Sequence, residues 1–333
     1  MEEQRPWAGR SVLVTGAGGF IGSHLVESLA RAGAHVRAFV RYNSRNDYGR
    51  LELVDPDLLE AVEIFTGDLT NPEAVAGAIA GREVVFHLGA LIPIPYSYRH
   101  PREFVAANVE GTLNVLEAAR RSGVGRIVHT STSEVYGTAQ TVPIAETHPL
   151  HPQSPYAASK VGADQLALSY ARSFELPVVV ARPFNTYGPR QSARAVIPTV
   201  AAQALTGDVV QLGATSPTRD FLFVADTVSG LLACASAAGV EGETFNIGTG
   251  VEVSIGDVAE RIVAIAGRPV EIVTSAERLR PAASEVERLS ADARLLRERT
   301  GWRPQVDLDD GLAQTVAWIR GALELFKPGI YNV

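Results

Sequence analysis

Cysteine, lysine and long apolar runs are scarce in this sequence of 333 residues, and each shortage excludes a class of protein. A single cysteine, Cys234, excludes a disulfide scaffold and a cysteine-based zinc site. No apolar run approaches the ~20 residues of a membrane-spanning helix. The net charge of −7 argues against a general nucleic-acid binder. Residues 1–10 contain no apolar stretch, so we predict no signal peptide and a cytoplasmic globule.

Lysine is so scarce in this sequence that each lysine position can be considered individually. The 30 basic residues include only two lysines, Lys160 and Lys327, and the remaining 28 are arginines. A general preference for arginine explains most of them, so a lysine that persists can mark a position that needs an amine. Lys160 lies inside the chain, whereas Lys327, near the end, has no predicted role.

Short apolar runs alternate with helix-like patterns through the first half of the chain. With 46% hydrophobic residues, the chain can bury a large core. Apolar strands of about five residues separated by helices are typical of a parallel sheet covered on both faces, which predicts a doubly wound α/β fold. The predicted strands are 11–15, 35–40, 62–66, 83–87, 126–130 and 177–182, and the helices are 22–32, 72–80, 104–122 and 156–174.

After Pro183 the alternation loosens, and segments rich in Gly, Pro and Thr interrupt it. Residues 221–224 and 244–247 still resemble strands, and 291–299 resembles a helix. We predict two interleaved domains. The sheet domain comprises residues 1–183 with about 220–250, and a smaller substrate domain comprises 184–219 and 251–333.

A glycine-rich loop follows the first predicted strand directly and reads Thr15-Gly16-Ala17-Gly18-Gly19-Phe20-Ile21-Gly22. Gly16 allows a tight turn, Gly19 lets a diphosphate approach the backbone, and Gly22 lets the next helix pack closely on the strand. The helix N-terminus offers free N–H groups and positive potential to an anion. Because the loop lies between a strand and a helix, it predicts a dinucleotide site.

The end of the second predicted strand indicates which dinucleotide is bound. NAD sites tend to place an acid there and NADP sites an arginine. Residues 39–45 contain no acid but two arginines, Arg41 and Arg45. We predict NADP, with NAD as the alternative because Arg41 could equally be a solvated loop residue. Asp68, after the third strand, could bind the adenine amino group or cap the helix that starts near Pro72.

Tyr156 and Lys160 are spaced i and i+4, so they lie on one face of a predicted helix. A phenol with a pKa of ~10 is a poor base near neutral pH. A nearby ammonium favours the phenolate and so lowers this pKa, and it can also hold the nicotinamide ribose. Arginine would carry the charge as a bulkier planar fork. We predict Tyr156 as a catalytic base and Lys160 as its partner.

The fifth predicted strand runs into Thr132-Ser133-Glu134, and doubly wound folds keep their sites at such strand ends. Thr132 can hydrogen-bond a substrate hydroxyl beside Tyr156. Glu134 is predicted to be a carboxylate base that faces the substrate. A surface acid or a cap on the following turn is the alternative for Glu134.

The chain resembles the extended short-chain dehydrogenase/reductases, the family of NAD(P)-dependent nucleotide-sugar epimerases and dehydratases. The resemblance covers nearly the whole chain and implies a Rossmann-type sheet domain with a smaller, interleaved C-terminal substrate domain. The motifs that carry it are the loop 16–22, Thr132, Tyr156, Lys160, Asn108 within 107–112, and the segments 182–190, 218–221 and 279–281 with Glu285.

Within this family the resemblance is strongest to sugar-nucleotide 4,6-dehydratases. The Thr-Ser-Glu before Val135 and the loop 40–51 are similar to those of GDP-mannose 4,6-dehydratases, which use NADP. Overall, the chain is most similar to the 4,6-dehydratases of the legionaminic acid pathway, which act on a nucleotide-linked N-acetylglucosamine. The dTDP-glucose 4,6-dehydratases have Thr-Asp-Glu, so Ser133 replaces a carboxylic acid that would protonate the leaving hydroxyl. Glu134 would then serve as base and afterwards as acid.

The resemblance implies a reaction that makes a 4-keto-6-deoxy sugar nucleotide from GDP- or UDP-linked N-acetylglucosamine or a related hexose. Tyr156 takes the proton of the sugar 4-hydroxyl while hydride passes from C4 to the nicotinamide. The new ketone acidifies the C5 hydrogen, Glu134 removes it, and water leaves from C6. Hydride then returns to C6, so a tightly bound cofactor is regenerated in each cycle.

The resemblance also assigns the site residues. The catalytic residues are Thr132, Ser133, Glu134, Tyr156 and Lys160. The cofactor site is expected to comprise Gly16, Gly19, Phe20, Ile21, Gly22, Arg41, Asp68, Leu69, Leu88, Ala90, Asn108, Thr130, Tyr156, Lys160 and Pro183. The substrate site is expected to comprise Leu91, Asn185, Arg190, Val196, Arg219, Arg280 and Glu285. Arg219 and Arg280 would hold the diphosphate, Glu285 would accept from ribose hydroxyls, and a solvated surface charge is the alternative for each arginine.

Other functions remain open from the sequence. A nucleotide-sugar 4-epimerase needs Thr132, Tyr156 and Lys160 but no elimination base, and Glu134 argues against it. A UDP-glucuronate decarboxylase can also carry Thr-Ser-Glu but usually has other residues between Tyr156 and Lys160. A non-catalytic NADP-sensing module tends to lose the Tyr–Lys pair, which this chain keeps.

The expected partner is a nucleotide-diphosphate sugar, with no nucleic acid and no membrane. We predict no metal, because His148 and His151 alone do not make a metal site. The resemblance implies a homodimer through a four-helix bundle of the helices 104–122 and 156–174. Core packing within one chain explains the same apolar faces.

Overall fold

Seven strands form the central sheet of the structure, a computed structural model that describes residues 6–327. Every neighbouring pair in this sheet is parallel. In spatial order the strands are β10 (Thr244–Ile247), β6 (Val178–Pro183), β5 (Arg126–Thr130), β4 (Val84–His87), β1 (Ser11–Thr15), β2 (His35–Arg41) and β3 (Glu63–Gly67). The predicted doubly wound α/β fold is confirmed. Residues 1–5 and 328–333, which the signal-peptide and domain predictions include, lie outside the described residues.

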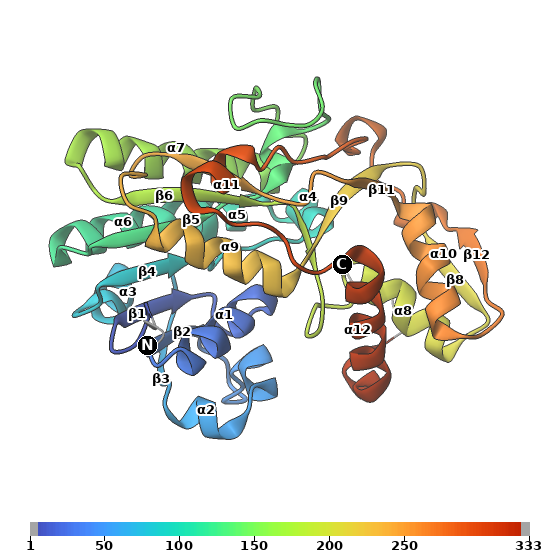
Figure 1. Cartoon of the computed structure of the whole chain (residues 1–333), viewed down its shortest axis with the longest axis horizontal. Coiled ribbons are helices and arrows are strands. Elements are labelled where there is room, and N and C mark those ends of the chain that lie inside the picture. Colours follow the sequence, from blue (N-terminus) through green and yellow to red (C-terminus); the bar gives the residue numbers. More distant parts are fainter. Residues whose placement is uncertain (1–5, 328–333) are drawn as a thin grey trace.

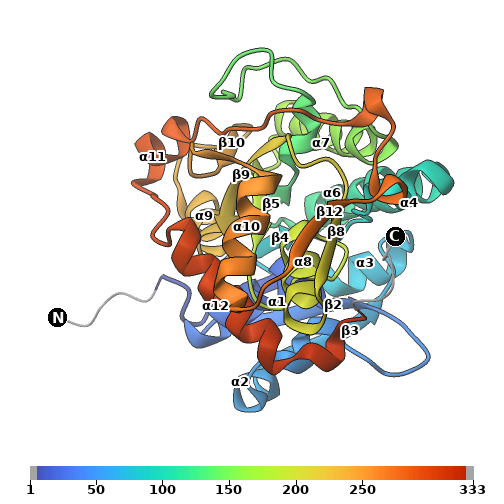
Figure 2. The same cartoon turned by 90° about the vertical axis from the view of Figure 1, so that its right-hand side faces the viewer.

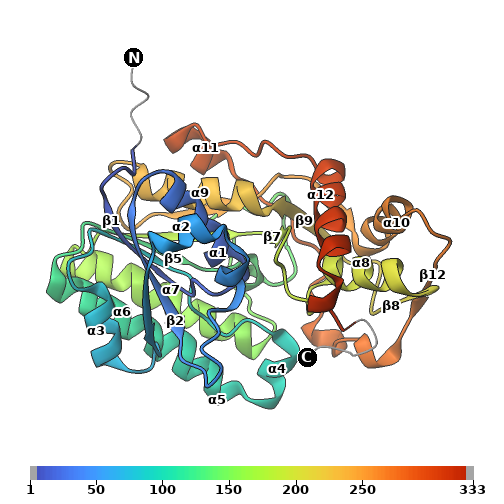
Figure 3. The ribbon, with the colours of Figure 1, turned by 90° about the horizontal axis from the view of Figure 1, so that it is seen from below.

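Helices cover both faces of the central sheet, and Figure 3 shows the two helical layers with the strands between them. One layer consists of α3 (Pro72–Ile79), α6 (Gly111–Ser122) and α7 (Pro155–Phe174). The other consists of α1 (Phe20–Arg31), α9 (Val224–Ser236) and α11 (Arg294–Thr300). This cover explains why the strands are apolar on both sides.

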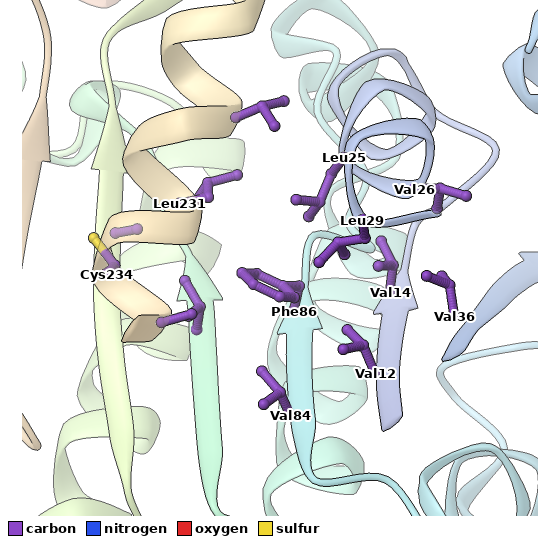
Figure 4. Packing of buried hydrophobic residues seen from close by; sticks show 14 of the residues in the cluster. Val12, Val14, Leu25, Val26, Leu29, Val36, Val84, Phe86, Leu231 and Cys234 are labelled. Carbon is purple, nitrogen blue, oxygen red and sulfur yellow. The ribbon is translucent and has the colours of Figure 1, made fainter. Parts of the chain in front are cut away.

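Alternate side chains of the strands enter different layers, because successive residues of a strand point to opposite faces. Val12 and Val14 of β1 pack with the α1–α9 layer, whereas Leu13 packs with the α3–α6–α7 layer. Figure 4 shows the first of these layers, in which Phe86 of β4 lies between the side chains of α1 and α9. Cys234 of α9 is fully buried there, and burial raises the pKa of its thiol to about 12. It is a small core residue.

The predicted single helix 104–122 is interrupted in the structure. It consists of α5 (Pro101–Phe104), a π-helical segment η2 (Val105–Glu110) and α6. Asn108, inside η2, bonds through its side chain to both the N–H and the C=O of Leu91 at 2.8 and 2.9 Å. A π-helical turn is frequent at functional sites, and here it places Asn108 against the loop after β4.

Most elements beyond Pro183 form a second group, which lies beside the central sheet in Figure 1 and faces the viewer in Figure 2. It contains a three-stranded sheet in the order β11 (Glu252–Ser254), β9 (Thr218–Phe223), β7 (Asn185–Tyr187), and a two-stranded sheet of β12 (Glu271–Thr274) and β8 (Val209–Leu212). The predicted strand 221–224 therefore belongs to a separate sheet. Three helices pack on these strands: α8 (Val196–Thr206), α10 (Ile255–Ala266) and α12 (Leu308–Gly321).

Two buried carboxylates tie the interleaved segments together. Asp220 of β9 accepts hydrogen bonds from the backbone N–H groups of Thr249, Gly250 and Ala291 at 2.8–3.0 Å. Asp226 of α9 accepts bonds from the N–H groups of residues 305 and 306 at 2.9 and 3.0 Å. Both carboxylates satisfy backbone groups that a buried loop would otherwise leave unpaired. The exact division into two domains stays a prediction.

Short helical turns lie in the connections. They are η1 (Gly49–Leu53), α2 (Pro56–Glu60), α4 (Ile94–Arg99), η3 (Ser133–Tyr136), η4 (Ala276–Arg278), η5 (Ala282–Ser284) and η6 (Leu323–Leu325). Of the helices between residues 6 and 327, none combines the length and the apolar character that crossing a membrane requires.

Candidate active site

A cavity of about 1060 Å³ opens at the carboxyl ends of the central strands. Its wall is formed by the loops after β1 to β6 on one side and by residues of the second group of elements on the other. The predicted residues that line it are Gly16, Gly19, Phe20, Ile21, Gly22, Arg41, Asp68, Leu69, Leu88, Ala90, Leu91, Thr130, Thr132, Ser133, Glu134, Tyr156, Lys160, Pro183, Asn185, Val196, Arg219, Arg280 and Glu285. The structure thus brings together nearly all of the predicted site.

The glycine loop has the geometry of an anion cradle at the N-terminus of α1. Gly16 has a φ of +68°, and a Cβ there would come within 2.7 Å of the backbone nitrogen of Gly89. A Cβ at Gly22 would collide with the carbonyl oxygen of Gly16. The N-cap of α1 is Gly19, which provides no side-chain cap, and the first turn contains no acid. The N–H groups of this turn are therefore available to a diphosphate, so these residues fit a dinucleotide.

Arg41 and Asp68 lie side by side at the ends of β2 and β3. Their side chains form an ion pair of 3.4 Å, and the Arg41 side chain is 78% exposed. The carboxylate of Asp68 accepts two bonds from Thr70, and these bonds and Arg41 lower its pKa despite burial. Asn71 and not Asp68 caps α3, through a bond from the N–H of Ala74. Asp68 therefore remains a candidate for the adenosine end of the cavity.

Tyr156 and Lys160 project from the first turns of α7 into the cavity. The helix begins with Ser154 as N-cap, whose hydroxyl accepts from the N–H of Ala157 at 3.1 Å, followed by Pro155. Tyr156 and Lys160 are 8% and 3% exposed. The Lys160 ammonium donates to the carbonyl oxygen of Thr130 at the end of β5, at 2.8 Å. This bond fixes the helix face against the sheet edge.

Burial moves the pKa values of Tyr156 and Lys160 in opposite directions, away from one another. Burial lowers the pKa of Lys160 from 10.5 to about 8, although the charge of Asp164 opposes this. Burial raises the pKa of Tyr156, and Glu134 raises it further, although the hydrogen bond of Thr132 opposes this. The rise is opposite to the expected direction, because desolvation of the phenolate dominates. With a pKa of about 8, the amine of Lys160 is still largely protonated at neutral pH.

Asp164, one helical turn beyond Lys160, is the centre of a buried polar network. Its carboxylate accepts from Ser131 Oγ at 2.8 Å and from two nitrogens of Arg182 at 3.0 and 3.2 Å. His129 Nε2 lies 3.2 Å from the same carboxylate. Hydrogen bonds and the neighbouring positive charges lower the pKa of Asp164 despite complete burial. The sequence analysis missed this network, although the i, i+4 spacing of Asp164 from Lys160 is a signal for it.

Thr132, Ser133 and Glu134 turn away from the end of β5 into the cavity. Thr132 is the N-cap of η3, and its hydroxyl accepts from the N–H of Glu134 at 3.3 Å. Ser133 is buried, and Glu134 is partly exposed within the cavity wall. The three residues therefore surround the position of Tyr156 from the sheet side.

Arg219 and Arg280 converge on Glu285 at the opposite wall. The distances from their nitrogens to Glu285 Oε1 are 3.3 and 3.6 Å. Burial lowers the pKa of Arg219, while the charges of Glu134 and Glu285 oppose this. Asn185 has a buried Oδ1 without a hydrogen-bond partner among the described residues. These groups form a polar wall suited to the diphosphate and ribose of a nucleotide.

Two predicted residues do not line the cavity. Asn108 lies behind it and bonds to the backbone of Leu91 and, at 2.9 Å, to Ser159 Oγ, so it supports the loop. Arg190 is buried against α1 and forms an ion pair of 2.6 Å with Glu27. Its guanidinium is thus engaged in holding the segment after β7 on α1.

Some cavity residues escaped the sequence analysis. They come from the loop after β2 and from the segment after β7, and they include Asn43, Tyr48, Gly49 and Gln191. These segments carry no hydrophobic period, so only the glycine at 49 and the local excess of arginine could have indicated them. No group of three or more His, Cys, Asp or Glu side chains within residues 6–327 is arranged to hold a metal ion.

Comparison with known proteins shows the family. The model of the family described as GDP-mannose 4,6 dehydratase matches residues 13–315. A dTDP-glucose 4,6-dehydratase of Actinoplanes sp. is 38% identical, over 93% of this chain and 97% of its own length. A UDP-glucose 4-epimerase of Mycolicibacterium smegmatis is 36% identical, over 92% of this chain and 98% of its own length.

Solved structures show the same likeness. An epimerase from Methanothermobacter thermautotrophicus has a TM-score of 0.86 at 30% identity and covers 96% of this chain and 95% of its own. The dTDP-glucose 4,6-dehydratase of Streptomyces venezuelae, solved as a double mutant with NAD bound, has a TM-score of 0.83 at 33% identity. The match covers 93% of this chain and 96% of that chain.

The chain belongs to the GDP-mannose 4,6 dehydratase family, within the extended short-chain dehydrogenase/reductases that act on nucleotide sugars. It is a sugar-nucleotide enzyme of the 4,6-dehydratase or epimerase kind.

The low pKa of Lys160 predicts an effect on stability. The unfolded chain binds more protons than the folded chain between pH ~8 and ~10.5, so the buried ammonium opposes folding fully below pH 8 and less as the pH rises. Lys160→Met should therefore raise the free energy of unfolding at pH 7 by about 3 kcal/mol, with little gain near pH 10.5, while it removes activity. Urea unfolding at several pH values measures this. Lys327→Met, at the only other lysine and exposed, is the control. Equal stability of Lys160→Met and the parent at pH 7 would contradict the expectation.

Proposed function

We propose that the protein is a nucleotide-sugar 4,6-dehydratase that converts a GDP- or UDP-linked hexose, such as N-acetylglucosamine, into the 4-keto-6-deoxy sugar. One observation carries this proposal. Glu134 lines the same cavity as Tyr156, and its charge is close enough to raise the pKa of the phenol. An oxidation at C4 needs one base, whereas an elimination across C5 and C6 needs a second. The Thr132-Ser133-Glu134 turn supplies that second base.

The residues divide the reaction between them. Tyr156 accepts the proton of the sugar 4-hydroxyl, and Lys160 stabilises the phenolate through its charge. Thr132 orients the same hydroxyl. A nicotinamide dinucleotide, when bound, accepts the hydride from C4 and later returns it to C6. Glu134 removes the C5 proton that the new ketone has acidified.

The departure of water from C6 needs a proton donor, and Ser133 occupies the position at which dTDP-glucose 4,6-dehydratases have an aspartic acid. Ser133 stands beside Glu134 and has no acidic proton to give to the leaving hydroxyl. Glu134 becomes protonated when it takes the C5 hydrogen, so it can pass that proton to the leaving oxygen. Arg219 lies close enough to Glu134 for their opposite charges to attract one another.

We also propose NADP as the dinucleotide, with the 2′-phosphate beside Arg41. No acid occurs in residues 39–45, where an NAD site would present one to the ribose. NAD, which is present in the solved structure of the Streptomyces venezuelae relative, is the alternative. Calorimetric titration is expected to show tighter binding of NADP than of NAD. Tighter binding of NAD would contradict this choice.

The remaining predictions concern assembly and location. We propose a homodimer through the outer faces of η2, α6 and α7. Two exposed apolar side chains support it: Val105 is 49% exposed and Leu113 is 36% exposed. The cytoplasm stays the predicted location.

Incubation with individual sugar nucleotides tests the reaction class. UDP- and GDP-linked N-acetylglucosamine, GDP-mannose, dTDP-glucose and UDP-glucuronate are supplied separately, and the products are weighed by mass spectrometry. We expect one hexose nucleotide to lose the mass of one water. An unchanged mass with inversion at C4 would favour the 4-epimerase, which the likeness to a UDP-glucose 4-epimerase keeps as the second candidate. Loss of carbon dioxide would favour a decarboxylase.

Glu134→Gln tests the elimination base. The variant keeps Tyr156 and Lys160, so we expect oxidation at C4 to proceed and elimination to slow by about 10²–10⁴-fold. Reduced cofactor should then accumulate and be visible by its absorbance and fluorescence. Glu298→Gln removes an exposed carboxylate of α11 and is the matched control. Normal dehydration by Glu134→Gln would remove Glu134 from the mechanism.

A further inference from the structure

One segment of the second group reaches across the cavity to the central sheet. Residues 276–286, here called the strap, follow β12 and carry Arg280 and Glu285; the strap is orange in Figure 2. Both of its ends are bonded to strands of the second group. The N–H of Ser275 donates to the end of β8 at 2.7 Å, and the carbonyl oxygen of Glu287 accepts from the start of β9 at 2.9 Å.

Ser284, in the middle of the strap, bonds to two segments of the first half of the chain. Its hydroxyl donates to the carbonyl oxygen of Gln153 at 2.6 Å. Because a serine hydroxyl has one hydrogen, its oxygen is the acceptor in the 2.5 Å bond with the hydroxyl of Tyr98. Tyr98 belongs to α4, and Gln153 directly precedes Ser154, the N-cap of α7. The strap is therefore joined both to α4 and to the start of the helix that carries Tyr156.

The side chain of Gln153 adds further bonds at the same place. Its amide nitrogen donates to the carbonyl oxygens of Ala283 and Glu285 at 3.1 and 3.0 Å. Its amide oxygen accepts from the N–H of Thr138 at 2.5 Å. Both amide hydrogens are used, so the amide has one orientation. The backbone of Glu285 is thus fixed from the α7 side, and Tyr98 adds a bond from the α4 side.

These bonds determine where Arg280 and Glu285 lie. Both residues line the cavity, and they pair at 3.6 Å. Nη1 of Arg280 is buried and makes no hydrogen bond within residues 6–327, so a donor remains for a ligand. Neither Tyr98 nor Ser284 lines the cavity, so their bond affects a bound nucleotide through the strap. Groups that are held in place before a ligand arrives bind it more tightly, because less conformational entropy is lost.

We propose that Tyr98 and Ser284 are positioning residues that hold the strap, and with it Arg280 and Glu285, in place for a nucleoside diphosphate. The inference deepens the proposed function and rests on its sugar-nucleotide substrate. Ile94 of α4 also packs in one buried cluster with Tyr156. One short helix therefore fixes both the wall that holds the nucleotide and the surroundings of the catalytic phenol.

Calorimetric titration of UDP, GDP and dTDP into the full chain tests the proposal without any sugar. We expect the parent to bind at least one of them. Tyr98→Phe removes only a hydroxyl and should weaken that binding about fivefold, which corresponds to one ordinary hydrogen bond. Ser284→Ala removes both bonds of the serine hydroxyl and should weaken it at least as much. The affinities of both variants for NADP and NAD should stay unchanged, because the strap carries no predicted cofactor residue.

Two comparisons separate positioning from a general loss of stability. Tyr170→Phe also removes a hydrogen-bonded phenol, which donates to Glu117 between α7 and α6 at 2.6 Å, and it should bind like the parent. In the double variant, Tyr98→Phe should add nothing to the effect of Ser284→Ala, because their shared bond is already lost. Additive losses, or an affinity of Tyr98→Phe equal to that of Tyr170→Phe, overturn the proposal.

The remaining outcomes distinguish this inference from the proposed function. If none of the three nucleoside diphosphates binds to the parent, the wall is not their site and the proposal is wrong. Weaker binding by Tyr98→Phe, together with no dehydration of any sugar nucleotide by the parent, keeps the positioning role and removes only the reaction. With an active parent, Tyr98→Phe should raise KM for the sugar nucleotide and leave kcat nearly unchanged.

Discussion

The ammonium group of Lys160 lies almost completely inside the protein, and the catalytic end of the cavity depends on how that charge is kept there. One hydrogen bond, to the carbonyl oxygen of Thr130, joins the helix α7 to the end of β5. The carboxylate of Asp164 lies one turn away and offsets part of the cost of burial. Arg182, Ser131 and His129 in turn hold that carboxylate in one orientation. A buried charge of this kind is tolerated when its hydrogen-bonding partners are satisfied. An ammonium beside Tyr156 favours the phenolate, the form of that side chain that can act as a base.

The two apolar layers of the fold make this polar centre possible. The parallel strands are covered on both faces, so their carboxyl ends form one edge at which six loops meet. The second group of elements closes the other side of that edge and contributes Arg219, Arg280 and Arg194. An overall charge of −7 is thus compatible with a cleft that is locally basic. A locally basic cleft suits a small polyphosphate, although a net negative charge disfavours binding of large polyanions.

Much of this arrangement could be predicted from the sequence because strong local signals carry it. The alternation of five-residue strands with helices predicts the central sheet, and the glycine spacing predicts the cradle at α1. Tyr156 and Lys160 follow from helical spacing on α7. Other features arise only from contacts between distant segments. No short window of sequence contains the burial and pairing on which these features depend. They are the ion pair of Arg190 with Glu27, the separate sheet of β9 and the raised pKa of Tyr156.

In the proposed reaction C4 is oxidised, water is eliminated across C5 and C6, and the hydride taken from C4 returns to C6. The comparisons leave dehydratase and epimerase chemistry both within the family, and the residues around Tyr156 serve the first step of either. A sugar nucleotide that carries deuterium at C4 separates them most directly, with nuclear magnetic resonance of the product as the measurement. We expect the deuterium to move within one molecule from C4 to the new methyl group at C6. Deuterium that stays at C4 would contradict it.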